Sequence, residues 1–257
     1  MSEEQIRAKL EAAGIENARF EARQLFGGFS GEALLAAVEK RCGGYPLQYI
    51  LGEWDFYRET YEVCEDCLIP RADTELLVEK AISMLPLGAR LLDLCTGSGC
   101  VAISTLCARP DATAVAVDLF EKTLAVADRN ARRNGVADRF TPMRADVLQK
   151  PPTALKDAPF SAILSNPPYI RADVMPTLQK EVQYEPKAAL CGGVDGLDFY
   201  RSILDQWTCL LANDGFILFE IGYDQAQDLI ALGQKKGLTA SVFADLGGND
   251  RVVLLQK

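Results

Sequence analysis

Four consecutive residues, Asn166, Pro167, Pro168 and Tyr169, follow a short apolar run at residues 162–164. The run predicts a buried strand, and the two prolines end it with a rigid backbone that has carbonyl acceptors but no N–H donors. Asn166 adds a side-chain amide oxygen, and Tyr169 adds a flat aromatic face. The combination indicates a preorganised, acceptor-rich edge for a planar substrate group. The alternative is a proline-rich loop that only ends a strand.

A planar NH2 group, in an amide or on an aromatic base, is a weak nucleophile because its lone pair is delocalised. If the Asn166 side-chain oxygen and the Pro167 carbonyl each accept one N–H, they orient the nitrogen toward an electrophilic carbon and stabilise the positive charge that develops on it. Tyr169 can stack on the planar group, and the proton can leave after the transfer. We therefore predict Asn166, Pro167 and Tyr169 as catalytic residues, with Pro168 completing the substrate site.

A glycine-rich turn supplies a candidate cofactor site. It lies in "DLCTGSGCVA", where Gly97, Gly99 and Ala102 fit the dinucleotide fingerprint G-x-G-x-x-G/A. Asp118 follows at the end of the next predicted strand, where a carboxylate can accept both hydroxyls of a ribose. NAD and S-adenosylmethionine both contain such a ribose. A purely structural turn, with Asp118 capping a helix, is the third possibility.

Asp93 separates the two cofactors, because a carboxylate just before the turn would repel a pyrophosphate but attract the cationic amino-acid end of S-adenosylmethionine. Asp146, after the third predicted strand, is placed to meet the adenine amino group, although it could equally begin a loop. We therefore predict an S-adenosylmethionine site without a metal ion. Its expected residues are Asp93, Cys95, Thr96, Gly97, Ser98, Gly99, Asp118, Asp146, Val147 and Asn166.

These residues need a scaffold that brings strand ends together. After a predicted helix at 73–85, apolar segments alternate with helical ones, at 89–95, 112–118, 139–146, 160–166 and 215–222. This alternation predicts an α/β fold with a doubly wound, mostly parallel sheet covered on both faces. A helix beginning near Asp224 is followed by strands at 239–245 and 251–257, which predict an antiparallel hairpin at the sheet edge.

Residues 1–44 predict a small helical domain of three short helices. Ser2 and Gln5 form a capping box for the first helix, and Asn17 can cap the second. The expected apolar faces of the first and third helices carry Ile6, Leu10, Ala13, Leu34, Leu35 and Val38. Residues 45–70 are aromatic and β-prone and predict a hairpin-like connector, which leaves 71–257 as the S-adenosylmethionine-dependent domain.

Composition narrows the functional classes. The chain has 257 residues, 49% of them hydrophobic, and a net charge of −9, which suits a globular protein and argues against one whose affinity comes from neutralising nucleic-acid phosphates. The absence of histidine excludes Ser-His-Asp and Cys-His catalysis and His-ligated metals. No apolar run of about 18 residues and no signal-peptide pattern occur, so we expect a cytoplasmic protein without membrane contact.

The eight cysteines follow no disulfide pattern of a small secreted domain, so we expect reduced thiols. Cys64 and Cys67 form a C-x-x-C that could be half of a zinc site or a redox pair. No second C-x-x-C and no histidine accompany it. Two thiols in a strand or hairpin are the simpler interpretation.

Four ordered motifs carry a resemblance to a known family: "QYILGEWDFY", "LIPRADTELLVE", "SNPPYI" and "GGVDGLDFY". Together with "DLCTGSG", they resemble the protein-(glutamine-N5) methyltransferases of peptide chain release factors, which are class I S-adenosylmethionine-dependent methyltransferases. The resemblance runs from about Tyr45 to the C-terminus and includes the helical domain. By position it places the cofactor loop on 95–99, the ribose acid on Asp118 and the substrate motif on 166–169.

The resemblance implies that the chain methylates the side-chain amide nitrogen of the glutamine in the Gly-Gly-Gln motif of release factors, with the helical domain helping to hold that partner. Cys95 stands where the family usually has glycine, and Val147 where some members place an aromatic residue beside adenine. We expect a monomer with no direct nucleic-acid contact. Competing readings are a DNA or RNA adenine methyltransferase, whose substrate also presents a planar NH2, an NAD-dependent oxidoreductase and a non-catalytic binding module.

Overall fold

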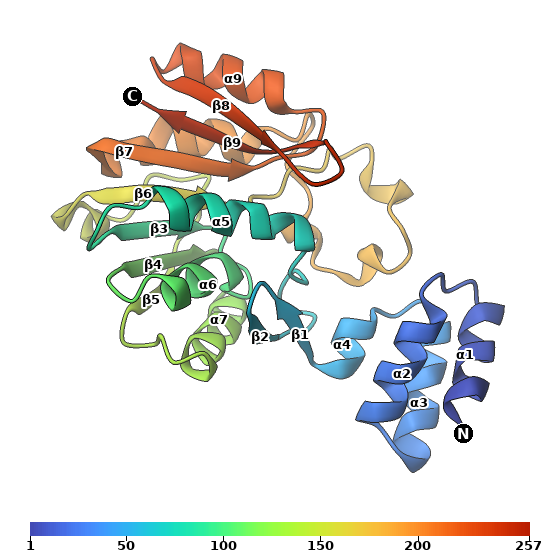
Figure 1. The fold of residues 1–257 in the computed structure, drawn as a ribbon. Coiled ribbons are helices and arrows are strands. Elements are labelled where there is room, and N and C mark those ends of the chain that lie inside the picture. Colours follow the sequence, from blue (N-terminus) through green and yellow to red (C-terminus); the bar gives the residue numbers. More distant parts are fainter.

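The computed structural model describes all residues, 1–257, and centres on a seven-stranded sheet with the order β5-β4-β3-β6-β7-β9-β8 (Figure 1). Strands β3 to β7 pair in parallel, whereas β9 pairs antiparallel with both β7 and β8. The predicted doubly wound sheet with an antiparallel edge hairpin is therefore confirmed. The strands are β3 (Arg90–Leu94), β4 (Thr113–Asp118), β5 (Phe140–Arg144), β6 (Phe160–Ser165), β7 (Leu211–Glu220), β8 (Thr239–Ala244) and β9 (Asp250–Gln256).

Both faces of the sheet are buried, as expected for parallel strands between two helical layers. Successive residues point to opposite faces, so Leu91 joins one apolar core and Leu92 the other. Helices α5 (Glu75–Met84), α6 (Cys100–Ala108) and α7 (Glu121–Arg133) cover the first face. The second face is covered by α8 (Asp198–Ser202), the following π-helical and 3-10 turns through Leu210, and α9 (Ala226–Lys235). None of these helices is long and apolar enough to cross a membrane.

Three N-terminal helices lie apart from the sheet: α1 (Glu3–Ala12), α2 (Ala18–Gly28) and α3 (Gly31–Cys42) (Figure 1). They share a small core of their own that includes Ile6, Leu10, Leu34 and Val38. The capping box of Ser2 and Gln5 is present. Three details were wrong. Leu35 is exposed because the packed face of α3 runs through Leu34, Ala37 and Val38. Ala13, also exposed, follows the end of α1 as its C-cap residue. The side chain of Asn17, although at the N-cap position of α2, makes no capping bond.

The connector begins with a helix rather than a strand. Pro46 precedes α4 (Leu47–Leu51), and Gly52 ends it in the left-handed conformation with φ +75°. The expected hairpin follows as β1 (Glu53–Phe56) and β2 (Glu59–Glu62), which pair antiparallel. Cys64 and Cys67 lie just beyond it as free thiols.

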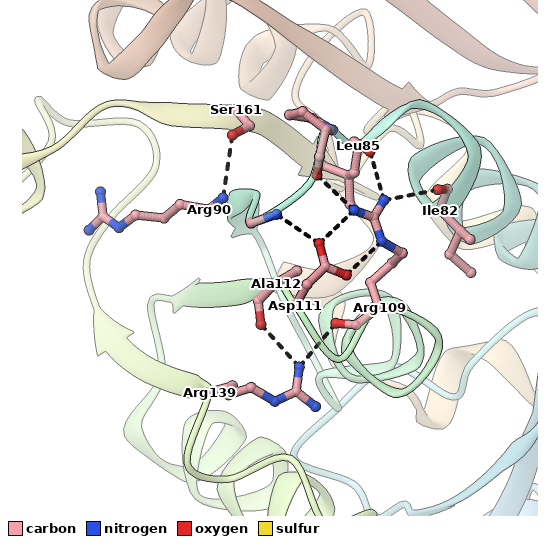
Figure 2. A network of polar contacts seen from close by, with 10 residues as sticks. Ile82, Leu85, Arg90, Arg109, Asp111, Ala112, Arg139 and Ser161 are labelled. Atoms are coloured by element: carbon pink, nitrogen blue, oxygen red, sulfur yellow. Dashed lines mark hydrogen bonds and ion pairs between the residues drawn. The ribbon is translucent and has the colours of Figure 1, made fainter.

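Two arginines tie together the loops at the amino ends of the strands (Figure 2). Arg109 donates to the carbonyls of Ile82 and Leu85, at the end of α5, and pairs with Asp111 at 2.8 Å. Arg139 donates to the carbonyl of Leu106, in the last turn of α6, and to those of Arg109 and Ala112, which follow α6. Cations at helix C-termini satisfy carbonyls that lack intrahelical partners. This network links the loops at the amino ends of the parallel strands, and the predicted site lies at the opposite, carboxyl ends.

The long segment after β6 reaches from the sheet to the N-terminal helices (Figure 1). It contains three short 3-10 turns, at Met175–Thr177, Val182–Tyr184 and Lys187–Ala189. Arg41 of α3, which is 3% exposed, pairs with Glu21 of α2 and also with Glu181 of this segment, each at 2.5 Å. Glu185 accepts from the Ile69 amide at 3.1 Å and pairs with Arg71. Helices, connector and segment are thus joined by buried charges.

Candidate active site

The predicted site residues gather where the strand order changes direction. From β3 the chain runs outward through β4 and β5 and then returns to β6 on the other side of β3. Ligands of open α/β sheets bind beyond the carboxyl ends of the strands at such a point. A cavity of about 370 Å³ lies there. Seven predicted residues line it: Cys95, Gly97, Asp118, Asp146, Val147, Asn166 and Pro168.

The turn after β3 depends on left-handed backbone conformations. Cys95, Gly97 and Gly99 have φ values of +61°, +57° and +83°. Gly99 does not line this cavity and has a packing role instead, because a Cβ there would lie 2.7 Å from Ile103 Cδ1 and 3.2 Å from Ala127 Cβ. Its small size lets α6 begin against α7, directly after the turn.

Asp118 connects this turn to the end of β4. Its two carboxylate oxygens accept from the amides of Gly97 and Phe120, each at 3.1 Å. Burial raises the pKa of the Asp118 carboxyl, and these amide bonds oppose the rise. The carboxylate is held in place by backbone donors while it lines the cavity, as an acceptor for ribose hydroxyls requires.

Asp93 lies deeper, in the wall of an adjoining cavity of about 40 Å³ that it shares with Thr96, Ser98 and Asn166. It accepts from Thr96 Oγ1 at 2.6 Å and from the Ala102 amide at 3.3 Å. Burial raises the pKa of this carboxyl to about 7, although these two hydrogen bonds lower it. An ionised Asp93 is therefore costly unless a cation lies near it.

Asp146 lies at the cavity and also begins a loop. It lines the cavity, and its Oδ1 also accepts from the Leu148 amide at 2.9 Å, as in a loop-starting turn. Apolar lining was largely missed from the sequence, since Leu119, Phe120 and Leu148 are exposed residues that line the same cavity beside Val147. Their position directly after Asp118 and Val147, outside any strand, was the available signal. Together they offer an apolar wall for a flat ring.

The Asn166 to Tyr169 motif is divided between the cavity, which Asn166 and Pro168 line, and the second apolar core, against which Tyr169 packs. Asn166 Nδ2 donates to Thr74 Oγ1 at 3.0 Å, and no donor of the chain bonds to Asn166 Oδ1 or to the Pro167 carbonyl. Tyr169 does not line the cavity; it packs against the second core, and burial beside Glu220 raises its pKa to about 12. Its carbonyl accepts from Gln225 Nε2 at 3.2 Å. Two free acceptors therefore remain, with Asn166 lining the cavity.

The residues present fit S-adenosylmethionine. No Lys or Arg of the chain pairs with Asp93, Asp118 or Asp146, so three carboxylates border the two adjoining cavities without a countercharge. This arrangement suits a ligand that carries an ammonium and a sulfonium and disfavours a pyrophosphate. The apolar wall suits adenine.

Comparison with known proteins places the chain in a family. The family model described as "Methyltransferase small domain" matches residues 72–187, a span that contains the glycine turn and the Asn166 to Tyr169 motif. A release factor glutamine methyltransferase of Geobacter sulfurreducens is 37% identical over 268 residues, covering 96% of this chain and 92% of its own. A release factor glutamine methyltransferase of Agrobacterium fabrum is 34% identical, and the alignment covers 98% of this chain and 94% of that protein.

The chain belongs to the release factor glutamine methyltransferase family. The predicted family and its S-adenosylmethionine dependence are thereby confirmed. A solved methyltransferase of Pyrococcus furiosus, 17% identical, aligns with a TM-score of 0.58 over 77% of this chain and 88% of its own, which supports the fold. In this family the cofactor supplies the methyl group, so the NAD-dependent reading is set aside.

Proposed function

We propose that this chain transfers a methyl group to the side-chain amide nitrogen of the glutamine in the Gly-Gly-Gln motif of peptide chain release factors, acting as a monomer. The names of the similar proteins support the substrate class. The observation that carries the proposal is the pair of free acceptors, Asn166 Oδ1 and the Pro167 carbonyl that follows it in the chain, with Asn166 lining a cavity suited to a cationic methyl donor.

Bound S-adenosylmethionine supplies a methyl group on a positively charged sulfur. The two acceptors each hold one N–H of the glutamine carboxamide, which orients the nitrogen and stabilises the positive charge that grows on it as the N–C bond forms and the C–S bond breaks. Once methylated, the nitrogen is acidic and its extra proton passes to water. No histidine is required. Asp93 holds the cationic amino-acid end, Asp118 holds the ribose, and Asp146 and Val147 border the adenine.

We further propose that residues 1–44 form a domain that docks the release factor and that residues 71–257 form the domain that transfers the methyl group. Residues 45–70 connect these two domains. A groove of about 890 Å³ lies between α2 and the β1–β2 hairpin. Phe20 and Phe26, which are 50% and 46% exposed, line it together with Trp54. Exposed aromatic side chains in a groove are typical of protein-binding surfaces.

The test is to incubate the protein with an intact release factor and labelled S-adenosylmethionine, and to locate the methyl group by tandem mass spectrometry. We expect one methyl on the glutamine of the Gly-Gly-Gln motif. An adenine-containing DNA and RNA, offered under the same conditions, test the alternative substrate. Efficient methylation of either nucleic acid, with no methylated glutamine, would overturn the proposal.

A further inference from the structure

Thr74 is the last residue of the 3-10 turn Ala72–Thr74, which leads directly into α5. Its backbone is already helical, with φ −67° and ψ −19°, and its side chain makes no capping bond to the first turn of α5. Instead Thr74 Oγ1, in a side chain that is 2% exposed, accepts from Asn166 Nδ2 at 3.0 Å. The hydroxyl is used across the fold, between α5 and the end of β6.

Glu220 offers an acceptor for the hydroxyl proton of Thr74. Its side chain, at the end of β7, is 1% exposed and lies beside Thr74. Burial raises the pKa of Glu220 to about 7, the nearby Thr74 hydroxyl opposes the rise, and Glu220 Oε2 has no hydrogen-bond partner in the chain. A hydroxyl has one proton to donate. When that proton points to Glu220, only lone pairs of Thr74 face Asn166, and they accept from the NH2 side of the amide.

We propose that Thr74 is a positioning residue, which holds the Asn166 amide so that its Oδ1 faces the reacting nitrogen of the acceptor. The inference rests on the proposed function for the identity of that acceptor. An asparagine amide has two faces with opposite hydrogen-bonding character. If Asn166 rotated by half a turn, an N–H would meet the N–H of the substrate, and the charge on the nitrogen would lose a stabilising acceptor.

The test compares Thr74→Val, which keeps the shape and removes the hydroxyl, with Thr74→Ser, which keeps the hydroxyl. Thr74→Val should lower kcat by about tenfold to a hundredfold, the range for losing one preorganised interaction of the transition state. KM for the release factor and the affinity for S-adenosylmethionine should stay nearly unchanged, and Thr74→Ser should restore kcat. Thr105→Val is the matched control, because Thr105 is also buried but bonds only to Val101 within α6.

A double-mutant cycle separates positioning from a general structural effect. If Thr74 acts through Asn166, its hydroxyl has nothing to position once the amide is gone. Thr74→Val should then cost little more in the Asn166→Ala background, although each single substitution lowers kcat. Independent, multiplying losses in the double variant would overturn the inference, as would a Thr74→Val enzyme with the parent's kcat.

A measurement that does not depend on enzyme activity tests this inference separately from the proposed function. The side-chain NH2 resonances of Asn166, assigned by their loss in Asn166→Ala, should shift in Thr74→Val and not in Thr105→Val. Unchanged resonances would contradict the positioning role. If the parent methylates an adenine rather than the glutamine, the proposed function fails, while the same kcat comparison on adenine still tests Thr74.

Discussion

Cys95 carries backbone strain at the cofactor turn. Its φ of +61° lies in the left-handed region, which costs a residue with a Cβ about 1 to 2 kcal/mol and glycine almost nothing. Cys95→Gly should therefore be more stable than Cys95→Ala by about 1 kcal/mol, since both lose the thiol but only glycine relieves the strain. Urea unfolding of the two variants measures the difference. Equal stabilities would show that the turn imposes no strain at this position.

Asp93 makes stability depend on pH. Its pKa is about 7 in the fold against an ordinary 3.8, so the folded state retains a proton that the unfolded chain has lost between these values. Stability is therefore highest at the acidic end of this window and falls as pH rises toward 7. In the absence of cofactor, Asp93→Asn should flatten the fall between pH 5 and 8 and be the more stable protein at pH 8. Denaturant unfolding at several pH values checks this; parallel curves for parent and variant would contradict it.

At the scale of elements, Arg139 joins the end of α6 to the start of β4 at the edge remote from the site (Figure 2). Arg139→Met leaves these carbonyls without their charged donor and should lower the free energy of unfolding by about 2 kcal/mol, with kcat unchanged. Arg132, whose pair with Asp128 is exposed, is the control, and Arg132→Met should cost less than about 1 kcal/mol. A lowered kcat in Arg139→Met, measured well below its unfolding temperature, would contradict a purely structural role.

At the scale of the whole molecule, the helical domain should matter only for a folded partner. Phe20→Ser with Phe26→Ser removes two exposed aromatic side chains from the groove and should raise KM for an intact release factor by about tenfold. KM for a short Gly-Gly-Gln peptide should not change, because it supplies the carboxamide without the remote contacts. Leu87→Ser is the control, as Leu87 is 89% exposed and lies outside the groove. Equal effects on protein and peptide would contradict docking there.

Deleting residues 1–42 is a less specific test of the same idea. The deletion should also reduce activity on the intact factor more than on the peptide. It removes Arg41, however, and so frees Glu181 in the segment that follows β6. That segment continues into the cavity wall at Ala188 and Cys191. The truncated protein would therefore report on docking and on the shape of the site together, whereas the groove variants separate them.

The sheet, its edge hairpin and the motifs at the strand ends could all be predicted from the sequence. Apolar strands alternating with helices allow few topologies, and parallel strands bring their carboxyl ends to one edge, so the glycine turn, Asp118 and Asn166 had to meet. Hydrogen bonds between residues close in the sequence could also be predicted, as for the capping box of Ser2 and Gln5.

The partners of those residues, in contrast, depend on how distant segments pack together. Thr74 and Asn166 lie far apart in the sequence, and nothing local distinguishes a threonine that caps a helix from one that holds a catalytic amide. The same holds for Gly99, whose role depends on the nearness of Ala127, and for Leu35, exposed because no neighbour covers its side of α3. Periodicity states which faces are apolar, but contacts between distant segments depend on how whole elements pack.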